Sequence, residues 1–330
     1  MKETKLNGRW PLVILAILLV GTVTIPARSA EGSFERTLAV TGSVELDVST
    51  GSGHISVRAG DSSSVHISGT IKASRNWRLD KGEAERKVHY LESNPPIEQH
   101  GNFIRVGHIE DRELSHNISV SYDLVVPADT HLRSQTGSGS QSVVGIRGPV
   151  KASTGSGNVK VENIGDDVRA ETGSGDLQVD SVKGTTHAST GSGSIRAGGI
   201  GSSFVVSTGS GSIRLEQTGS GDGKVETGSG SIDLQNVRGA LRVRTGSGNI
   251  TAQGDATGEW SLHTGSGRVL VHLPSGAAFD LNAHTSSGHI STDHPITVQG
   301  TIGRGELRGK VRGGGPLVQL ETGSGNIQIE

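Results

Sequence analysis

Two short segments have residue types that could support catalysis or nucleotide binding. The run from Gly219 to Lys224 (GSGDGK) resembles a phosphate-binding loop, but Val225 and Glu226 follow where a P-loop continues with Ser or Thr and a helix. Asp166 and Asp167 are adjacent carboxylates. Hydrolysis of a glycosidic bond needs two carboxyl groups that flank the bond across a cleft, and neighbours in a turn do not provide this. The sequence therefore predicts no nucleotide site and no acid–base pair.

The spacing also invites comparison with calcium-binding repeats. Segments of the chain recur every 18 residues, which is twice the nine-residue period of β-rolls that bind Ca²⁺ through an aspartate in each repeat. The position after each Gly-Ser-Gly is mostly neutral, whereas Ca²⁺ prefers repeated anionic oxygen ligands. The residues at this position are Asn158, Asp176, Ser194, Ser212, Ser231, Asn249 and Arg268. We expect turn residues here and no calcium site.

The histidines are the other candidate metal ligands, and the chain has 13 of them. His263 and His284 each precede a corner threonine, an arrangement that would stack them in adjacent coils, with His289 nearby. Two imidazoles about 5 Å apart could share a metal, but no acidic ligand recurs at a fixed spacing. With no cysteine, disulfides, Cys-ligated zinc and thiol catalysis are excluded. We assign no catalytic, cofactor-binding or metal-ligating residue and expect no cofactor.

The elements that position all these residues are set by an internal repeat. The tetrapeptide Thr-Gly-Ser-Gly occurs eleven times, and eight copies follow one another at intervals of 18 or 19 residues. Their threonines are Thr136, Thr154, Thr172, Thr190, Thr208, Thr227, Thr245 and Thr264. A fixed period of this length indicates stacked structural units, each of which contacts only its neighbours.

Apolar residues alternate on both sides of each threonine. They lie two and four residues before it and five and seven residues after it, which predicts two short strands with one buried face each. In the coil of Thr154 these residues are Val150, Ala152, Val159 and Val161. A further apolar residue ten positions after the threonine closes the coil: Ile164, Val182, Ile200 or Val237. The Gly-Ser-Gly segment is then a corner, where glycine allows positive φ and close stacking.

The corner position also bears on two other kinds of binding. Ice-binding solenoids present threonines on a flat strand face, whereas a threonine before Gly-Ser-Gly lies at a bend. Sugar binding favours exposed aromatic rings, but the array has only Phe204, Trp260 and Phe279. Phe204 and Trp260 occupy the inward position four residues before the threonine, so we assign them to the core.

The repeat continues, less regularly, at both ends. Thr50–Val57 is an early coil, Thr285–Gly288 is a degenerate corner, and Thr322–Ile329 is a final coil. The stretch Thr301–Leu307 is interpreted as one more corner with an inserted residue. Between the early coil and the array, residues 61–131 predict capping strands, and the charged run Lys81–Ser93 predicts a helix that Pro95-Pro96 ends. The predicted strands lie around Val65–Ile71, Phe103–Val106 and Ile118–Val126.

Residues 1–29 have the features of a secretory signal peptide. A basic start precedes an apolar run from Pro11 to Ile25, and Ala27-Arg-Ser29 offers a small-x-small cleavage site. An uncleaved membrane anchor is the alternative, although the apolar run is shorter than the roughly 20 residues that span a bilayer.

Glycine is abundant at 51 residues and aromatic residues make up only 3%. This composition suits thin stacked coils better than one broad core.

The segment Ile118–Thr130 (ISVSYDLVVPADT), running into Thr136-Gly-Ser-Gly and repeated TGSGxIxL units, resembles the bacterial putative-adhesin family of β-strand-repeat proteins of unknown function. The resemblance covers roughly Phe34 to Glu330. It implies an exported, single-stranded β-helix-like fold, which we expect to be right-handed. It offers no catalytic residue to carry over to this chain.

These observations predict an all-β, single-stranded β-solenoid with coils of 18 or 19 residues and an N-terminal strand and helix elaboration. We expect three parts: a signal peptide or anchor (1–29), a first coil with capping strands and a short helix (30–131), and the repeat solenoid (132–330). The expected function is an exported, non-catalytic adhesive or structural module of the bacterial envelope. A glycan- or peptidoglycan-binding or modifying protein and a membrane-anchored periplasmic partner in envelope-stress signalling are the alternatives.

The charges and the N-terminal segment limit the expected partners. Basic residues are interspersed along a chain of net charge −2, which argues against nucleic acid. We expect an envelope protein or a surface glycan as the partner. Contact with a membrane would come only through the N-terminal segment, if it is not cleaved.

Overall fold

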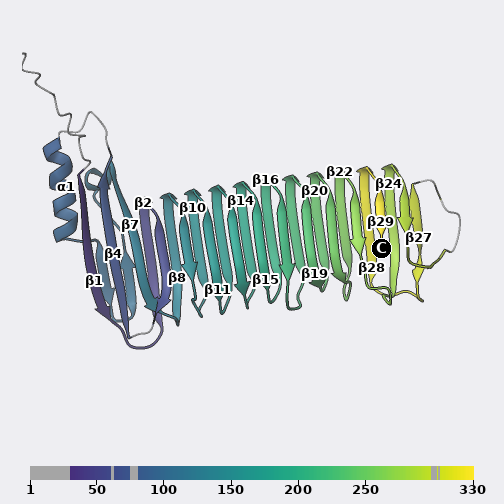
Figure 1. Ribbon diagram of the computed structural model, residues 1–330, viewed down its shortest axis with the longest axis horizontal. Helices are drawn as coiled ribbons and strands as arrows, with labels where there is room; N and C mark the ends of the chain where they lie inside the picture. The colour runs from purple at the N-terminus through teal and green to yellow at the C-terminus, as the bar shows by residue number, and fades with distance from the viewer. Residues whose placement is uncertain (1–29, 61–62, 75–80, 299–302, 304) are drawn as a thin grey trace, which may run out of the picture.

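The chain forms a long rod of stacked β-coils in the computed structural model (Figure 1). The structure describes residues 30–60, 63–74, 81–298, 303 and 305–330. Two sheets run along the rod, one of 15 strands and one of 14. We call the first the threonine sheet, because its strands end at the Thr-Gly-Ser-Gly corners, and the second the facing sheet. The predicted all-β solenoid fold is confirmed.

Eight consecutive coils form the regular array, each with one strand in each sheet. In the threonine sheet they are β8 (Thr130–Ser138), β10 (Val150–Ser156), β12 (Val168–Ser174), β14 (Thr186–Ser192), β16 (Phe204–Ser210), β18 (Gly223–Ser229), β20 (Leu241–Ser247) and β22 (Trp260–Ser266). In the facing sheet they are β9 (Gln141–Val144), β11 (Val159–Ile164), β13 (Leu177–Val182), β15 (Ile195–Ile200), β17 (Ile213–Gln217), β19 (Ile232–Arg238), β21 (Ile250–Asp255) and β23 (Val269–His272). Neighbouring strands are parallel, and each threonine pairs with the threonine of the next coil, as Thr154 does with Thr136 and Thr172.

The core is the narrow space between the two sheets. Alternation within each strand sends every second side chain inward, so each coil contributes a few aliphatic residues that are almost fully buried. Burial of one such side chain stabilises the fold by roughly 1.5–3 kcal/mol. Phe204 and Trp260 are 0% exposed and Phe279 is 1% exposed, which confirms the inward placement of the first two.

The corner threonines are part of this core. Each of the ten that follow the first coil is at most 6% exposed and donates its hydroxyl to a glycine carbonyl of the adjacent coil, at 2.9–3.2 Å. In the coil of Thr172 the acceptor is the Gly157 carbonyl at 2.9 Å. The hydroxyls therefore link successive coils, and no rank of these threonines faces the solvent.

The two glycines of each corner meet different requirements. Gly175, the second glycine of its corner, has a φ of +150°, in a region that favours glycine. Gly173, the first glycine, cannot be replaced by a residue with a side chain for another reason: a Cβ there would lie 2.6 Å from the Gly155 carbonyl oxygen of the preceding coil. The predicted corner is thus confirmed, with close stacking as the constraint at its first glycine.

The N-terminal end combines a first coil with non-repetitive strands. Its elements are β1 (Glu31–Ala39), β2 (Val44–Ser52), β3 (Ile55–Gly60), β4 (Ser64–Ala73), α1 (Lys81–Ser93), β5 (Ile97–His100), β6 (Phe103–Val106), α2 (Arg112–Ser115) and β7 (Ile118–Pro127). Strands β2 and β3 stack on β8 and β9 as the first coil. Beyond it, β7 pairs with β3 in parallel, and β4 and β1 extend the facing sheet with antiparallel pairs. The β5–β6 hairpin extends the threonine sheet through the parallel pairing of β6 with β2. The predicted helix and capping strands are confirmed, and β8 spans the expected boundary at residues 131–132.

The C-terminal end departs from chain order. Its strands are β24 (Phe279–Ser287), β25 (Ile290–Thr292), β26 (Ile296–Thr297), β27 (Glu306–Val311), β28 (Leu317–Ser324) and β29 (Ile327–Ile329). The last coil, β28 with β29, lies between the coil of β22 and β23 and the coil of β24 and β25. The chain therefore forms the outermost coil before it forms the coil beneath it.

The predicted corner at Thr301–Leu307 is wrong in its described part. Glu306 and Leu307 begin β27, which runs antiparallel to β24, and β26 pairs with β27 as the last strand of this end of the threonine sheet. Left-handed residues after β27, including Arg312 at φ +48° and Gly313 at φ +91°, turn the chain back toward β28. The predicted signal peptide or anchor at 1–29 lies outside the described residues. Within the described part of the chain, neither helix has the length and apolarity to span a membrane.

Candidate binding faces of the solenoid

The outward side chains of the array form straight rows along the rod. On the threonine sheet, the residues one and three positions before each threonine point outward, as the burial pattern of β12 shows for Arg169 and Glu171. In-register parallel pairing places the same position of successive coils side by side, about 4.8 Å apart. We therefore describe each candidate binding surface as a row, meaning the outward side chains at one position of successive coils.

One outward row of the threonine sheet carries most of the aligned cations. It is the position three residues before the threonine, and we call it the basic row: Arg133, Lys151, Arg169, His187, Lys224 and Arg242, with Val205 between His187 and Lys224. These side chains are exposed or half-buried. Basic residues that are interspersed in the sequence thus lie on one line. This alignment could be predicted from the repeat period, because each of these residues stands at the same distance from a corner threonine.

The cations of the basic row differ in their partners. Arg169 pairs with Glu171, Nε to Oε1 at 2.8 Å, and Lys224 pairs with Glu226 at 3.1 Å. Arg133 and Lys151 have no ion pair or side-chain hydrogen bond within the described residues. Gln135 and Ser153 occupy the positions that Glu171 and Glu226 occupy in the coils of Arg169 and Lys224. Arg242, farther along the row, likewise has no ion pair within the described residues, and at the N-terminal end Asp47 of the first coil lies next to Arg133 in the same row.

A groove of about 590 Å³ lies over this part of the threonine sheet. Arg133, Lys151 and Arg169 line it together with the half-buried ring of Phe103 and with Pro149. The ring is positioned by β6, which pairs with β2 and so brings Phe103 beside the first coil. The Arg105 guanidinium lies 5.5 Å from the centre of the Phe103 ring. Glu45, Asp47 and Asp167 also line the groove, which therefore combines an aromatic surface with charges of both signs.

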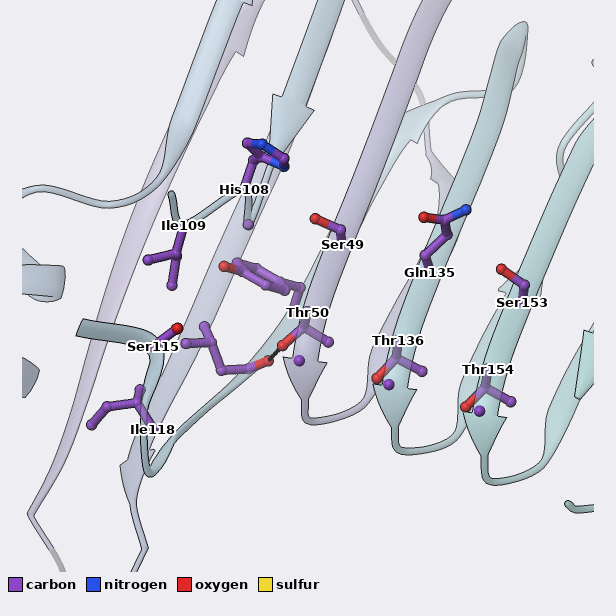
Figure 2. A pocket seen from close by; sticks show the side chains of 16 residues that line it. Ser49, Thr50, His108, Ile109, Ser115, Ile118, Gln135, Thr136, Ser153 and Thr154 are labelled. Atoms are coloured by element: carbon purple, nitrogen blue, oxygen red, sulfur yellow. Dashed lines mark hydrogen bonds between the residues drawn. The ribbon is translucent and has the colours of Figure 1, made fainter. Parts of the chain in front are cut away.

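A second groove, of about 600 Å³, lies where the N-terminal strands meet the array (Figure 2). Figure 2 shows Ser49, Gln135 and Ser153 in one row on its floor, with the corner threonines in the next row. The Thr50 hydroxyl donates to the Val120 carbonyl at 2.8 Å, so the capping strand β7 supplies the acceptor that a preceding coil supplies elsewhere. The buried Tyr122 also lines this groove. Its hydroxyl has no hydrogen-bond partner among the described residues, and desolvation by burial raises its pKa above the usual range.

The histidine pair predicted in adjacent coils is wrong. The inserted C-terminal coil places Glu321 between His263 and His284 in the row. His263 Nδ1 lies 3.3 Å from Glu321 Oε2. The backbone N–H of His289 donates to Asn326 Oδ1 at 3.0 Å. Across the described residues, no group of three or more His, Asp or Glu side chains is close enough to hold a metal ion.

The other candidate oxygens stabilise the stack itself. Asn158 Oδ1 accepts the backbone N–H of Asp176 at 2.9 Å, and Asp176 Oδ1 accepts that of Ser194 at 2.8 Å. Asp167 Oδ1 likewise accepts the Thr185 N–H of the next coil at 2.7 Å. These carboxylate and amide groups satisfy backbone donors at the corners. The GSGDGK run leads directly into strand β18, without the helix that a P-loop requires.

Residues 43–330 match the family model described as Toastrack DUF4097. The chain belongs to this family. The match covers nearly all of the solenoid and confirms the resemblance identified from the Ile118–Thr130 segment and the repeats that follow it. A comparison with curated proteins gives no match.

Several solved structures are similar to this Toastrack chain. One is a putative cell adhesion protein from Clostridium sporogenes, at 12% identity and a TM-score of 0.25, with 90% of this chain and 99% of that chain covered. A putative adhesin from Bacteroides fragilis has 8% identity and a TM-score of 0.27, with 91% and 97% covered. A putative adhesin from Parabacteroides merdae has 11% identity and a TM-score of 0.27, with 91% and 96% covered.

Proposed function

We propose that the chain is an exported, non-catalytic surface-binding rod of the bacterial envelope, acting as an adhesin or a structural module. The observation that carries this proposal is the set of continuous outward rows, of which the basic row is the most strongly charged. A partner that lies along the rod would contact the same position in coil after coil, so many weak contacts would add up.

The internal use of the corner groups supports the same function. The threonine hydroxyls and several corner carboxylates already bind backbone groups of neighbouring coils. The groups that remain available to a partner are therefore the side chains of the outward rows. Export rests on the signal-peptide features of residues 1–29, and the placement at the envelope follows from it.

Binding of a glycan is the second candidate, and Phe103 favours it. Its ring is half-buried and lines the groove on the threonine sheet together with charged side chains of both signs. Ligand sites commonly combine an apolar or aromatic wall with a few polar groups. The groove has both features at one end of the basic row.

Co-sedimentation tests the proposed function. The purified chain is incubated with isolated sacculi, with outer membranes and with a soluble envelope extract, and the chain alone serves as the control for self-association. We expect saturable pelleting with sacculi or membranes. Absence of pelleting would contradict the proposal, and capture of one discrete protein from the extract would favour the partner in envelope-stress signalling.

A further inference from the structure

We propose that two copies of this chain join through the C-terminal ends of their rods by exchanging the coil of β28 and β29, residues 317–329. We call it the inserted coil, because it lies between the coil of β22 and β23 and the coil of β24 and β25. In the joined form, the inserted coil of each copy occupies this place in the other copy. The inference goes beyond the proposed function, because it concerns how two rods assemble and not what a rod binds.

The two coils that flank the inserted coil match each other in register. In the threonine sheet, Thr322 pairs with Thr264 on one side and with Thr285 on the other. In the facing sheet, β29 likewise pairs in parallel with β23 and with β25. The flanking coils therefore place their corners and their buried positions at the same level, and they can stack directly on each other when the inserted coil is withdrawn.

Withdrawal of the inserted coil is less costly than withdrawal of an interior coil. The stability of stacked units is approximately a sum of terms for each unit and for each contact between neighbours. Withdrawal breaks two contacts, with the hydrogen bonds from Thr322 to the Gly267 carbonyl and from Thr285 to the Gly325 carbonyl, both 2.9 Å. Closure of the gap restores one contact. The interior coil of β12 and β13 cannot leave in this way, because three-residue connections join it to the coils on both sides.

The connection between β27 and β28 has the properties of a hinge. It consists of residues 312–316 (RGGGP), in which Arg312, Gly313 and Gly314 have φ values of +48°, +91° and +92°. The connection crosses the end of β24, because β27 and β28 lie on opposite sides of that strand. Consecutive glycines allow such a segment to change its conformation at little steric cost. Extension of this connection carries the inserted coil away from its own rod and toward a second one.

The closed connection also leaves one buried acceptor unsatisfied. Asp280 Oδ1 lies beside Gly314, where an added Cβ would be only 2.3 Å from it, and it has no hydrogen-bond partner among the described residues. A buried acceptor without a partner destabilises the state that contains it. Extension of the connection moves Gly314 away, so that water can reach this oxygen, and this favours the exchanged form.

The exchanged form keeps the contacts of the inserted coil. The inserted coil of one copy meets β22, β23, β24 and β25 of the other copy in the registers that it has in a single chain. The two forms differ in the connection and in the entropy lost when two chains join, so their balance depends on protein concentration. Two joined rods also present their outward rows twice to one surface, which strengthens binding to that surface.

Disulfide trapping tests the exchange, because the chain has no cysteine of its own. Ser261 and Gln319 are register partners on the outward faces of β22 and β28. Paired strands are about 4.8 Å apart, within the Cα separation of roughly 4.4–6.8 Å that a disulfide bridges. The folded Ser261→Cys chain and the folded Gln319→Cys chain are incubated together and then oxidised. We expect a disulfide-linked dimer of the two different chains, in an amount that rises with protein concentration.

Ser189 and Ser207 supply the matched control. They are register partners in the interior strands β14 and β16, and their hydroxyl oxygens lie 3.2 Å apart. The Ser189→Cys chain and the Ser207→Cys chain, treated in the same way, should give no linked dimer, because interior coils do not exchange. In a single chain, the double variants Ser261→Cys, Gln319→Cys and Ser189→Cys, Ser207→Cys should both close, which shows that each pair has the geometry of a disulfide.

A shorter connection provides a second test without cysteines. Deletion of residues 313–315 leaves two residues to cross β24, a span of two strand spacings or roughly 10 Å. Two residues and the links on either side of them reach at most about 11 Å when they are fully extended. Strain then disfavours the closed form, and we expect the shortened chain to elute as a dimer in size-exclusion chromatography with light scattering, at a concentration where the unaltered chain is mainly a monomer.

Three outcomes would overturn the inference. The first is no linked dimer from the Ser261→Cys and Gln319→Cys chains although the double variant closes, and the second is as much linked dimer from the interior pair. The third is a shortened chain that stays monomeric and keeps the melting temperature of the unaltered chain. Pelleting with envelope material by a chain that does not exchange would refute this inference alone, and exchange without any pelleting would refute the proposed function alone.

Discussion

The interior coils and the two ends of the rod are built by different rules. In the interior, each strand pairs with the strand one coil away, so that Val150 contacts Val168 and Val168 contacts Thr186. At the ends, pairing joins segments that are distant in the sequence: β28 pairs with β22, and β2 pairs with β8. The comparison shows that repetition suffices to stack coils but not to terminate the stack.

The physical reason lies in the exposed edges. An interior strand has both edges paired, whereas the first and last strands of a parallel stack would present free N–H and C=O groups to other chains. Antiparallel strands cover the facing sheet at its N-terminal end, as β4 and β1 beyond β7, and the threonine sheet at its C-terminal end, as β27 against β24. Among the described strands, the C-terminal end of the facing sheet is β25, which pairs in parallel with β29. The antiparallel strands need sequences that do not obey the repeat, which explains why the repeat pattern weakens at both ends.

The largest expected effect comes from removing residues out of phase with the coil. Deleting Val168–Thr185 removes one full coil and brings β10 beside β14 in the existing register, so we expect the protein to fold with a modest loss of stability. Deleting only Val168–Asp176 removes a strand from one sheet and not from the other, and we expect loss of the fold. Thermal unfolding followed by circular dichroism measures both. Equal losses would contradict the stacked-coil account of the interior.

A smaller effect is expected at the first glycine of a corner. The Gly173→Val side chain would meet the Gly155 carbonyl of the preceding coil, and such overpacking costs about 1–3 kcal/mol. Gly51 occupies the same position in the first coil, where nothing lies within 4 Å of an added Cβ. We therefore expect Gly51→Val to change stability by less than about 0.5 kcal/mol. Melting temperatures that fall by the same amount in both variants would refute the stacking explanation.

The smallest effect concerns the threonine hydroxyls and asks whether the cap replaces a coil. Thr172→Val removes the donor to the Gly157 carbonyl and should cost about 1 kcal/mol of unfolding free energy. Thr50→Val should cost a similar amount, because the Val120 carbonyl of the cap accepts its hydroxyl. Urea denaturation compares them, with Thr172→Ser and Thr50→Ser as hydroxyl-retaining controls. A neutral Thr50→Val beside a costly Thr172→Val would mean that the cap does not substitute for a coil.

The interior could be predicted almost residue by residue. The inward position of Val150, the closing role of Ile164 and the corner at Thr154 all follow from the period and from alternation, and burial confirms each of them. Helix α1 was predictable for a local reason, since a charged amphipathic run ended by Pro95-Pro96 fixes its own boundaries. Each of these features depends on residues close together in the chain.

The sites were harder to predict, because they depend on which coils become neighbours. Arg133 and Lys151 are 18 residues apart, and only their shared distance from a threonine indicates that they lie side by side. Phe103 lies near them because β6 pairs with β2, and the repeat period does not predict that pairing. His263 and His284 show the opposite case, since the period places them in adjacent coils and the structure separates them with Glu321.

The sequence by itself therefore determined the coil, its two strands, its buried positions and the membership in a repeat family. Those features arise from alternation of apolar residues and from glycines at corners, which act within one coil and its neighbour. Only the tertiary structure decided the order of the last two coils, the antiparallel strands at the ends and the approach of Phe103 to the basic row. These depend on long-range pairing of open strand edges, and any strand with free N–H and C=O groups in register can satisfy such an edge, wherever it lies in the chain.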